Sequence, residues 1–211
     1  MTALLATAVG TGVLATPDRA LLDLAQSLAS PPLDTAMFSV SLLGAVEVTI
    51  PAMFLLCLAN TGLPLLDWRR WLPFTIMAAL VLVELAAKQA VPDAAPPAAL
   101  HRGPTFGVGV ATPFSFPSGH MVRATMVLGI LAARLGRRRG GRPWGVLAVA
   151  VLLVLGFSRV YLAEHWPADV LGGLLLGAAG LAACLALAPG PPPPPEAPGP
   201  LPGEAPGELR S

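Results

Sequence analysis

Stretches of apolar residues alternate with short polar segments along most of the chain. A helix needs about 20 predominantly apolar residues to cross the hydrocarbon core of a bilayer. By this measure the pattern predicts six membrane-spanning helices, at residues 2–16, 33–58, 71–91, 118–135, 144–158 and 168–187. The first stretch has only about 15 residues and is a weak candidate. Two other interpretations stay open for it: the core of a signal peptide that lacks the usual basic segment, or a misassigned start codon.

Two segments outside these stretches have patterns of their own. Residues 18–30 place apolar side chains on one side of a helix and polar ones opposite, which predicts a short interfacial helix. The apolar stripe consists of Leu21, Leu22, Leu24, Ala25 and Leu28. Residues 189–211 are rich in proline and predict a disordered or polyproline-like tail. The predicted fold is all-α: an integral membrane bundle of six helices over residues 1–188, with the interfacial helix, followed by the tail.

The composition agrees with a membrane protein. Apolar residues make up 55% of the 211 residues and charged residues 12%, and the mean hydropathy is +0.70. A soluble domain carries about 25% charged residues. The net charge is +1, so no nucleic acid partner is expected. Cys57 and Cys184 each lie inside an apolar stretch and are interpreted as small buried side chains.

Arginines are concentrated in two predicted loops that lie on the same side of a six-span protein. These are Arg69 and Arg70 after the second span, and Arg134, Arg137, Arg138, Arg139 and Arg142 around the loop after the fourth. Cytoplasmic loops carry an excess of basic residues, so this side is predicted to face the cytoplasm, together with both termini. The residue usage is typical of a GC-rich bacterial genome, which predicts the bacterial inner (plasma) membrane.

Polar residues at the other ends of the spans fall on the opposite side of the membrane. Lys88 ends the third span, the sequence Pro-Ser-Gly-His at 117–120 opens the fourth, and Arg159 ends the fifth. His165 and Asp169 open the sixth. Polar residues at the edge of a bilayer core are costly and usually functional. The pattern therefore predicts one site on the extracytoplasmic face.

The residue types at 118–120 suit an anion. Ser118 is a natural helix N-cap, and the N-terminus of a helix favours negative charge. Gly119 lets the backbone approach the anion closely. His120, in the first turn, is placed to give a proton to a leaving oxygen. Taken alone, the same residues also fit an ordinary helix start with an interfacial histidine.

A second group has the spacing Arg-x5-His-x3-Asp. His165 and Asp169 are four residues apart, so in a helix they share a face. A carboxylate bonded to one imidazole nitrogen fixes the tautomer and leaves the other nitrogen able to attack phosphorus. The planar guanidinium of Arg159 can hold phosphate oxygens. The alternative is a structural His–Asp pair beside an arginine that reaches the membrane surface.

These residues resemble the motifs of the type 2 phosphatidic acid phosphatase superfamily: Lys-x6-Arg-Pro, Pro-Ser-Gly-His and Ser-Arg-x5-His-x3-Asp. The second motif is complete at 117–120 and the third at 158–169. The resemblance implies a six-helix membrane fold, no metal and no cofactor. It also implies that His165 forms a phosphohistidine, that Asp169 orients it and that His120 protonates the leaving group. The phosphate-binding residues it implies are Lys88, Ser118, Gly119 and Arg159. The related vanadium haloperoxidases are soluble, and the predicted spans argue against them.

The first motif is incomplete because Ala95 stands where the family has arginine, although Lys88 and Pro96 are present. Two other arginines near the same face, Arg102 and Arg123, are tentative replacements. Arg102 could instead be an interfacial anchor. Arg123 could instead pair with an acidic residue inside the membrane, either Glu84 or Glu47, and Glu84 is also spaced for an ion pair with Lys88.

The predicted function is metal-independent hydrolysis of a lipid phosphate or diphosphate at the extracytoplasmic membrane face. Expected substrates are a polyprenyl diphosphate, phosphatidate or phosphatidylglycerophosphate, and the expected partners are this substrate and membrane lipids. Two alternatives stay open from the sequence: a phosphotransferase that uses a second lipid as acceptor, and a lipid-phosphate-binding protein impaired in catalysis by the missing arginine.

Overall fold

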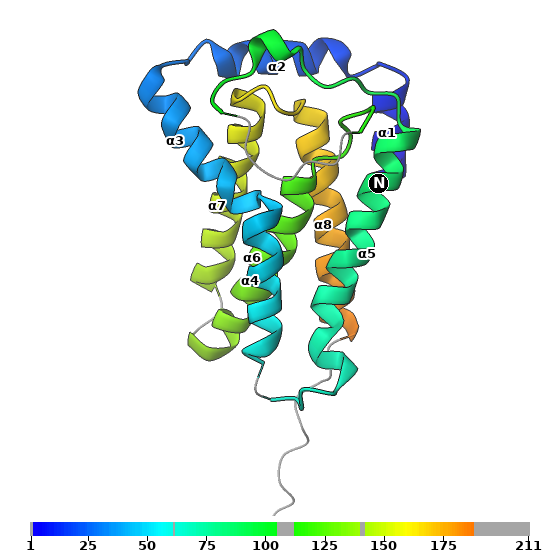
Figure 1. Cartoon of the computed structure of the whole chain (residues 1–211), viewed down its shortest axis with the longest axis vertical. Helices are drawn as coiled ribbons and strands as arrows, with labels where there is room; N and C mark the ends of the chain where they lie inside the picture. Colours follow the sequence, from blue (N-terminus) through cyan, green and yellow to red (C-terminus); the bar gives the residue numbers. More distant parts are fainter. Residues whose placement is uncertain (1, 61, 105–111, 140–141, 188–211) are drawn as a thin grey trace, which may run out of the picture.

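The chain folds into a bundle of helices with a further helix lying across one end (Figure 1). The computed structural model describes residues 2–60, 62–104, 112–139 and 142–187. The elements are α1 (Thr2–Gly10), α2 (Ala15–Gln26), α3 (Pro31–Ser41), η1 (Leu42–Gly44), α4 (Val46–Leu58), α5 (Trp68–Ala90), η2 (Ala98–Leu100), α6 (Gly119–Arg139), α7 (Arg142–Tyr161) and α8 (Pro167–Leu187). No strand occurs within these ranges, so the all-α prediction is confirmed.

Helix α6 lies in the middle of the bundle and packs against α4, α5, α7 and α8. Glycines on α8 allow its backbone to approach α6, in the way that small residues pack helices in membranes. At Gly177, for example, an added Cβ would lie 2.7 Å from Thr125 Cβ and 2.8 Å from the Val122 carbonyl oxygen. This close packing fixes the start of α8 against the start of α6, where the second and third motifs meet.

Three helices among the described residues, α5, α7 and α8, are long and apolar enough to cross a membrane. The pair Pro31–Gly44 and Val46–Leu58 adds a fourth crossing if its two parts form one span, bent by 43°. The predicted span at 33–58 is therefore broken rather than continuous. The break is at Ala45, whose backbone is extended, and it presses Gly44 onto His120: a Cβ on Gly44 would lie 2.8 Å from His120 Cβ.

The predicted first span does not form, and six spans are not confirmed. Residues 2–16 contain the nine-residue α1, a turn at Gly12 with φ of 72°, and the start of α2. Nine residues rise about 14 Å, far less than the hydrocarbon thickness of about 30 Å. Through Val9, α1 packs on Phe116 and Ala168 at the end of the bundle that holds the site. Without that crossing, the predicted cytoplasmic position of the N-terminus no longer follows.

The interfacial helix is present as α2, which lies across the end of the bundle where α7 ends and α8 begins (Figure 1). Leu22 is fully buried beside Tyr161 and Leu162, whereas Leu21, Leu24 and Leu28 point outward. The Gln26 amide donates to the Leu100 carbonyl oxygen at 2.8 Å. The predicted tail at 189–211 lies outside the described residues.

Candidate active site

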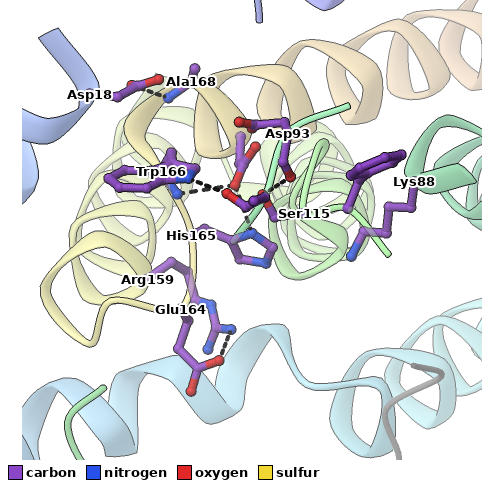
Figure 2. Close-up of polar contacts among 12 residues, drawn as sticks. Asp18, Lys88, Asp93, Ser115, Arg159, Glu164, His165, Trp166 and Ala168 are labelled. Carbon is purple, nitrogen blue, oxygen red and sulfur yellow. Dashed lines mark hydrogen bonds and ion pairs between the residues drawn. The ribbon is translucent and has the colours of Figure 1, made fainter. Parts of the chain in front are cut away.

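The polar groups predicted to converge do lie at one end of the bundle, where α5 and α7 end and α6 and α8 begin (Figure 1). Each comes from the end of a packed helix or the loop beside it. Figure 2 shows Lys88 and Arg159 on either side of the His165 ring. The helix ends that hold these groups are far apart in the chain, so the packing around α6 sets their arrangement.

His165 lies in the short loop between α7 and α8. The N–H groups of Glu164 and His165 both donate to the Arg159 carbonyl oxygen, at 3.1 and 3.3 Å. Ala163 has a φ of 55°, a left-handed conformation that reverses the chain. This tight loop turns the His165 ring back toward the bundle, where the side chain is buried.

Asp169 holds the His165 ring. Its Oδ2 lies 3.2 Å from His165 Nδ1 and accepts the Trp166 N–H at 3.0 Å. With the proton on Nδ1, the free lone pair is on Nε2. Burial, and then the positive charges of Arg159, Lys88 and Arg123, hold the pKa of His165 well below its ordinary value. The imidazole is therefore neutral, as a nucleophile has to be.

The start of α6 forms a cradle beside this histidine. The Ser118 N–H donates to the Asp169 carbonyl oxygen at 3.0 Å, which ties the two motifs together. The Ser118 hydroxyl is fully buried and has no hydrogen-bond partner among the described residues. A buried hydroxyl without a partner costs free energy unless a ligand supplies one. Together with the helix N-terminus at Gly119, it suits an anion.

Arg159 lies on the other side of the cradle and is almost fully buried. Its Nη1 donates to the Ser41 hydroxyl, and its Nη2 lies 3.4 Å from a carboxylate oxygen of Glu164. A cavity of about 30 Å³ opens beside it, with His120, Ser41 and Glu164 in its wall. Ser41 is the last residue of α3, so the bent α3–α4 pair supplies one wall of the site.

Glu84 links two of the predicted cations. One of its carboxylate oxygens lies 3.3 Å from Lys88 Nζ and the other 3.4 Å from Arg123 Nη1. Arg123 Nη2 also donates to the Gly44 carbonyl oxygen at 3.4 Å. The carboxylate lies directly against Gly119, since an added Cβ there would be 2.5 Å from Glu84 Cδ. Both ion pairs considered for Glu84 are present, and Arg123 lies at the cradle.

Arg102 lies elsewhere. Its Nη1 is 3.6 Å from Asp34 Oδ2, and the same aspartate accepts the Tyr161 hydroxyl. Its backbone N–H donates to the Leu162 carbonyl oxygen at 3.1 Å. The side chain of Ala95, where the family motif has arginine, is exposed. Of the two tentative replacements, Arg123 is the one linked through Glu84 to Lys88 and to the start of α6.

Sequence reasoning did not find four polar residues that support the site: Ser41, Asp93, Ser115 and Asp18. Asp93 lies within the variable spacer of the incomplete first motif, where nothing local marks it as functional. Ser115 donates from both its N–H and its hydroxyl to the Asp93 carbonyl oxygen, at 2.9 and 3.1 Å. Asp18 reaches from α2 and accepts the Ala168 N–H at the start of α8, at 2.9 Å. All four act through contacts between distant parts of the chain.

The model of the PAP2 superfamily matches residues 69–190, which is more than half of the chain. The chain belongs to the PAP2 superfamily. The match includes all three motif positions, and the family predicted from the motifs is confirmed. This PAP2 protein is an integral membrane protein, as its apolar helices and membrane relatives indicate.

Two sequence relatives and one solved structure are similar to this chain. Phosphatidylglycerophosphatase B of Bacillus subtilis (strain 168) is 28% identical over 185 residues, 82% of this chain and 84% of the relative. An undecaprenyl-diphosphatase of Sulfolobus acidocaldarius is 35% identical over 66 residues, 31% of this chain and 30% of the relative. The crystal structure of a transmembrane PAP2-type phosphatidylglycerolphosphate phosphatase from Bacillus subtilis superposes with a TM-score of 0.70 at 24% identity. It covers 88% of this chain and 90% of that one, which shows the shared fold.

Proposed function

We propose that this PAP2 protein is a lipid phosphate phosphatase that works without a metal ion, through a phosphohistidine intermediate on His165. The observation that carries the proposal is the neutral, carboxylate-held His165 facing a cradle of cations and N–H groups. The similar proteins are phosphatases of phosphatidylglycerophosphate and undecaprenyl diphosphate. Hydrolysis of a lipid phosphate is the chemistry that both lines support.

The reaction takes two displacements at phosphorus. In the first, His165 Nε2 forms a bond to phosphorus as the bond to the lipid oxygen breaks, and His120 donates a proton to that oxygen. The positive charge on the imidazole is stabilised by Asp169 at 3.2 Å. In the second, His120 removes a proton from water, the water oxygen bonds to phosphorus and the P–N bond breaks. Phosphate leaves, and both histidines return to their starting states.

The cations stabilise the transferring phosphoryl group, whose charge spreads over three oxygens. We assign this role to Lys88, Arg159 and Arg123, together with the Ser118 hydroxyl and the N–H groups at Gly119. Arg159 holds its guanidinium with Ser41 and Glu164 and keeps Nε buried without a partner among the described residues. Donors fixed before the reaction need no reorganisation in the transition state.

We infer a phosphatidylglycerophosphate, polyprenyl diphosphate or phosphatidate as substrate, on the extracytoplasmic face of a bacterial plasma membrane. The arginine-rich loops support this orientation, since Arg69 and Arg70 start α5 at the end of the bundle opposite the site (Figure 1). The test is phosphate release by purified protein in detergent from a panel of these three lipids. Transfer of the phosphoryl group to an added lipid alcohol, in place of release to water, would indicate a phosphotransferase.

Chelation of divalent metals should leave turnover unchanged. Within the described residues there is no group of three or more His, Cys, Asp or Glu side chains arranged to hold a metal ion. In the proposed site, side-chain cations and N–H groups stabilise the negative charge of the phosphate in place of a metal ion. We expect initial rates with and without EDTA to agree within about twofold. Loss of activity in EDTA that an added divalent metal restores would contradict the metal-independent mechanism.

The orientation predicts opposite labelling of two loops. In a background with Cys57→Ala and Cys184→Ala, Ala98→Cys should react with a membrane-impermeant maleimide in intact cells, because Ala98 is exposed near the site. Gly62→Cys, in the exposed loop between α4 and α5, should react only after the cells are opened. The reverse pattern would place the site in the cytoplasm.

A further inference from the structure

A second carboxyl group lies beside the catalytic His–Asp pair. Asp93 follows the end of α5, and Figure 2 shows it next to Ser115, Trp166 and His165. The backbone of Asp93 is held by the two hydrogen bonds that its carbonyl oxygen accepts from Ser115. The Asp93 and Asp169 side chains are within hydrogen-bonding reach of each other. Asp93 is therefore fixed where it touches the group that orients His165.

Each of these two carboxyl groups has one buried oxygen without a hydrogen-bond partner among the described residues. These oxygens are Asp93 Oδ2 and Asp169 Oδ1. The Ser115 hydroxyl, which donates to the Asp93 carbonyl oxygen, is the nearby donor that acts on both carboxyl groups. The other Asp169 oxygen, Oδ2, is taken by His165 and Trp166. Two carboxylates have only acceptors to offer each other, so the contact is repulsive unless one of them carries a proton.

The surrounding charges make double ionisation costly. A third carboxylate, Asp18 on α2, adds negative charge near Asp93 and Asp169. Across the site, Lys88 on α5 adds positive charge near Asp169, and the neutral His165 contacts Asp169 Oδ2. Burial, and then the neighbouring Asp169 carboxylate, raise the pKa of Asp93 to about 7. Burial raises the pKa of Asp18 to about 6, although its carboxylate accepts the Ala168 N–H.

We propose that Asp93 and Asp169 share one proton, and that Asp93 is a positioning residue whose carboxyl donates to Asp169 and holds it against His165. This proposal rests on the proposed function of His165 as nucleophile. The shared proton satisfies both buried oxygens. It also leaves one net negative charge to stabilise the imidazolium as the P–N bond forms.

The proton defines a pH window. The carboxyl pair is protonated below the pKa of Asp93 and doubly charged above it, so the alkaline side should lose activity from about pH 7. Stability should follow the same group. Because the folded state holds this proton and the unfolded state releases it near pH 4, stability should fall as pH rises from about 4 to about 7 and then level off.

The test compares Asp93→Asn with wild type over pH. The amide keeps a donor for Asp169 and cannot ionise, so kcat/KM of this variant should stay on its plateau at least about one pH unit further into the alkaline range. Its Tm in detergent should fall less than that of wild type between about pH 4 and pH 7, because the contribution of Asp93 is gone and that of Asp18, whose pKa is raised to about 6, remains. Asp93→Ala, which has neither donor nor charge, should lose at least about tenfold in kcat/KM below about pH 7, where the wild-type pair holds its proton.

Two controls keep the result specific. Asp23→Asn removes an exposed carboxylate on α2 that pairs with Arg19, and its pH profiles should match wild type. Asp18→Asn removes a neighbouring carboxyl whose pKa is also raised. The proposal is overturned if the alkaline loss of activity and the full decrease in Tm of wild type persist in Asp93→Asn. It is also overturned if Asp18→Asn, and not Asp93→Asn, removes the alkaline loss of activity. The Tm arm is independent of turnover, so inactivity of all forms would count against the proposed function and leave the proton-sharing test intact.

Discussion

Replacement of His165 by alanine should abolish phosphate release while leaving the fold intact. The imidazole combines a neutral nitrogen, a carboxylate on its other nitrogen and adjacent cations. Removal of the nucleophile in enzymes of this kind costs at least about 10⁴-fold in kcat. The measurement is initial phosphate release from the best lipid of the panel, alongside Tm in detergent.

The matched control for this variant is His101→Ala. His101 is exposed in the loop before α6, and its loss should leave kcat/KM within about twofold of wild type. A properly folded His165→Ala protein that turns over at the normal rate would show that another group attacks phosphorus. If His165→Ala loses its cooperative melting, His165→Asn, which keeps a polar side chain of similar size near Asp169, replaces it in the assay.

Arg123→Ala should lower kcat/KM by at least about 10²-fold, the scale for loss of one donor to a developing charge. Arg123 lies at the cradle, where its charge acts on His165, and it shares Glu84 with Lys88. With Ala95 unable to contribute, Arg123 is the candidate for the missing first-motif arginine. Arg102→Ala should have a smaller effect because Arg102 pairs with Asp34, away from Glu84.

The loss in Arg123→Ala has a second possible cause, because removal of the arginine leaves the Glu84 carboxylate with one cation fewer. The double variant Arg123→Ala/Glu84→Gln separates the two causes. If Arg123 binds phosphate, the double variant stays impaired by about 10²-fold. Recovery to near-normal activity in the double variant, or normal activity in Arg123→Ala itself, would mean that the enzyme works with a reduced phosphate pocket.

Local sequence signals predicted the parts of the fold that local physics determines. The apolar runs that became α5, α7 and α8 are long enough to specify spanning helices by themselves. The run at 2–16 is too short for that, and the glycine turn at Gly12 divides it. The bend between α3 and α4 depends on packing of Gly44 against His120, which lies 76 positions away and leaves no mark in the apolar pattern.

Some contacts of the site could likewise be predicted from sequence spacing, and others could not. The His165–Asp169 pair lies four residues apart at the start of one helix, so its contact followed from spacing. The partners of Arg159 and Asp169 did not, because Ser41 and Asp93 come from distant segments. Arg123 was predicted both as a phosphate ligand and as a partner of Glu84. The structure shows the ion pair, and the phosphate contact stays a prediction.

The central claim is that a phosphoryl group is transferred to His165. The most direct measurement is rapid mixing of purified enzyme with a terminally radiolabelled lipid phosphate, an alkaline quench, and mapping of the labelled peptide by mass spectrometry. The account predicts a base-stable, acid-labile phosphate on His165 that forms and decays within one turnover and is absent from His165→Ala. Label on any other residue, or release of phosphate in the first turnover with no labelled protein, would contradict it.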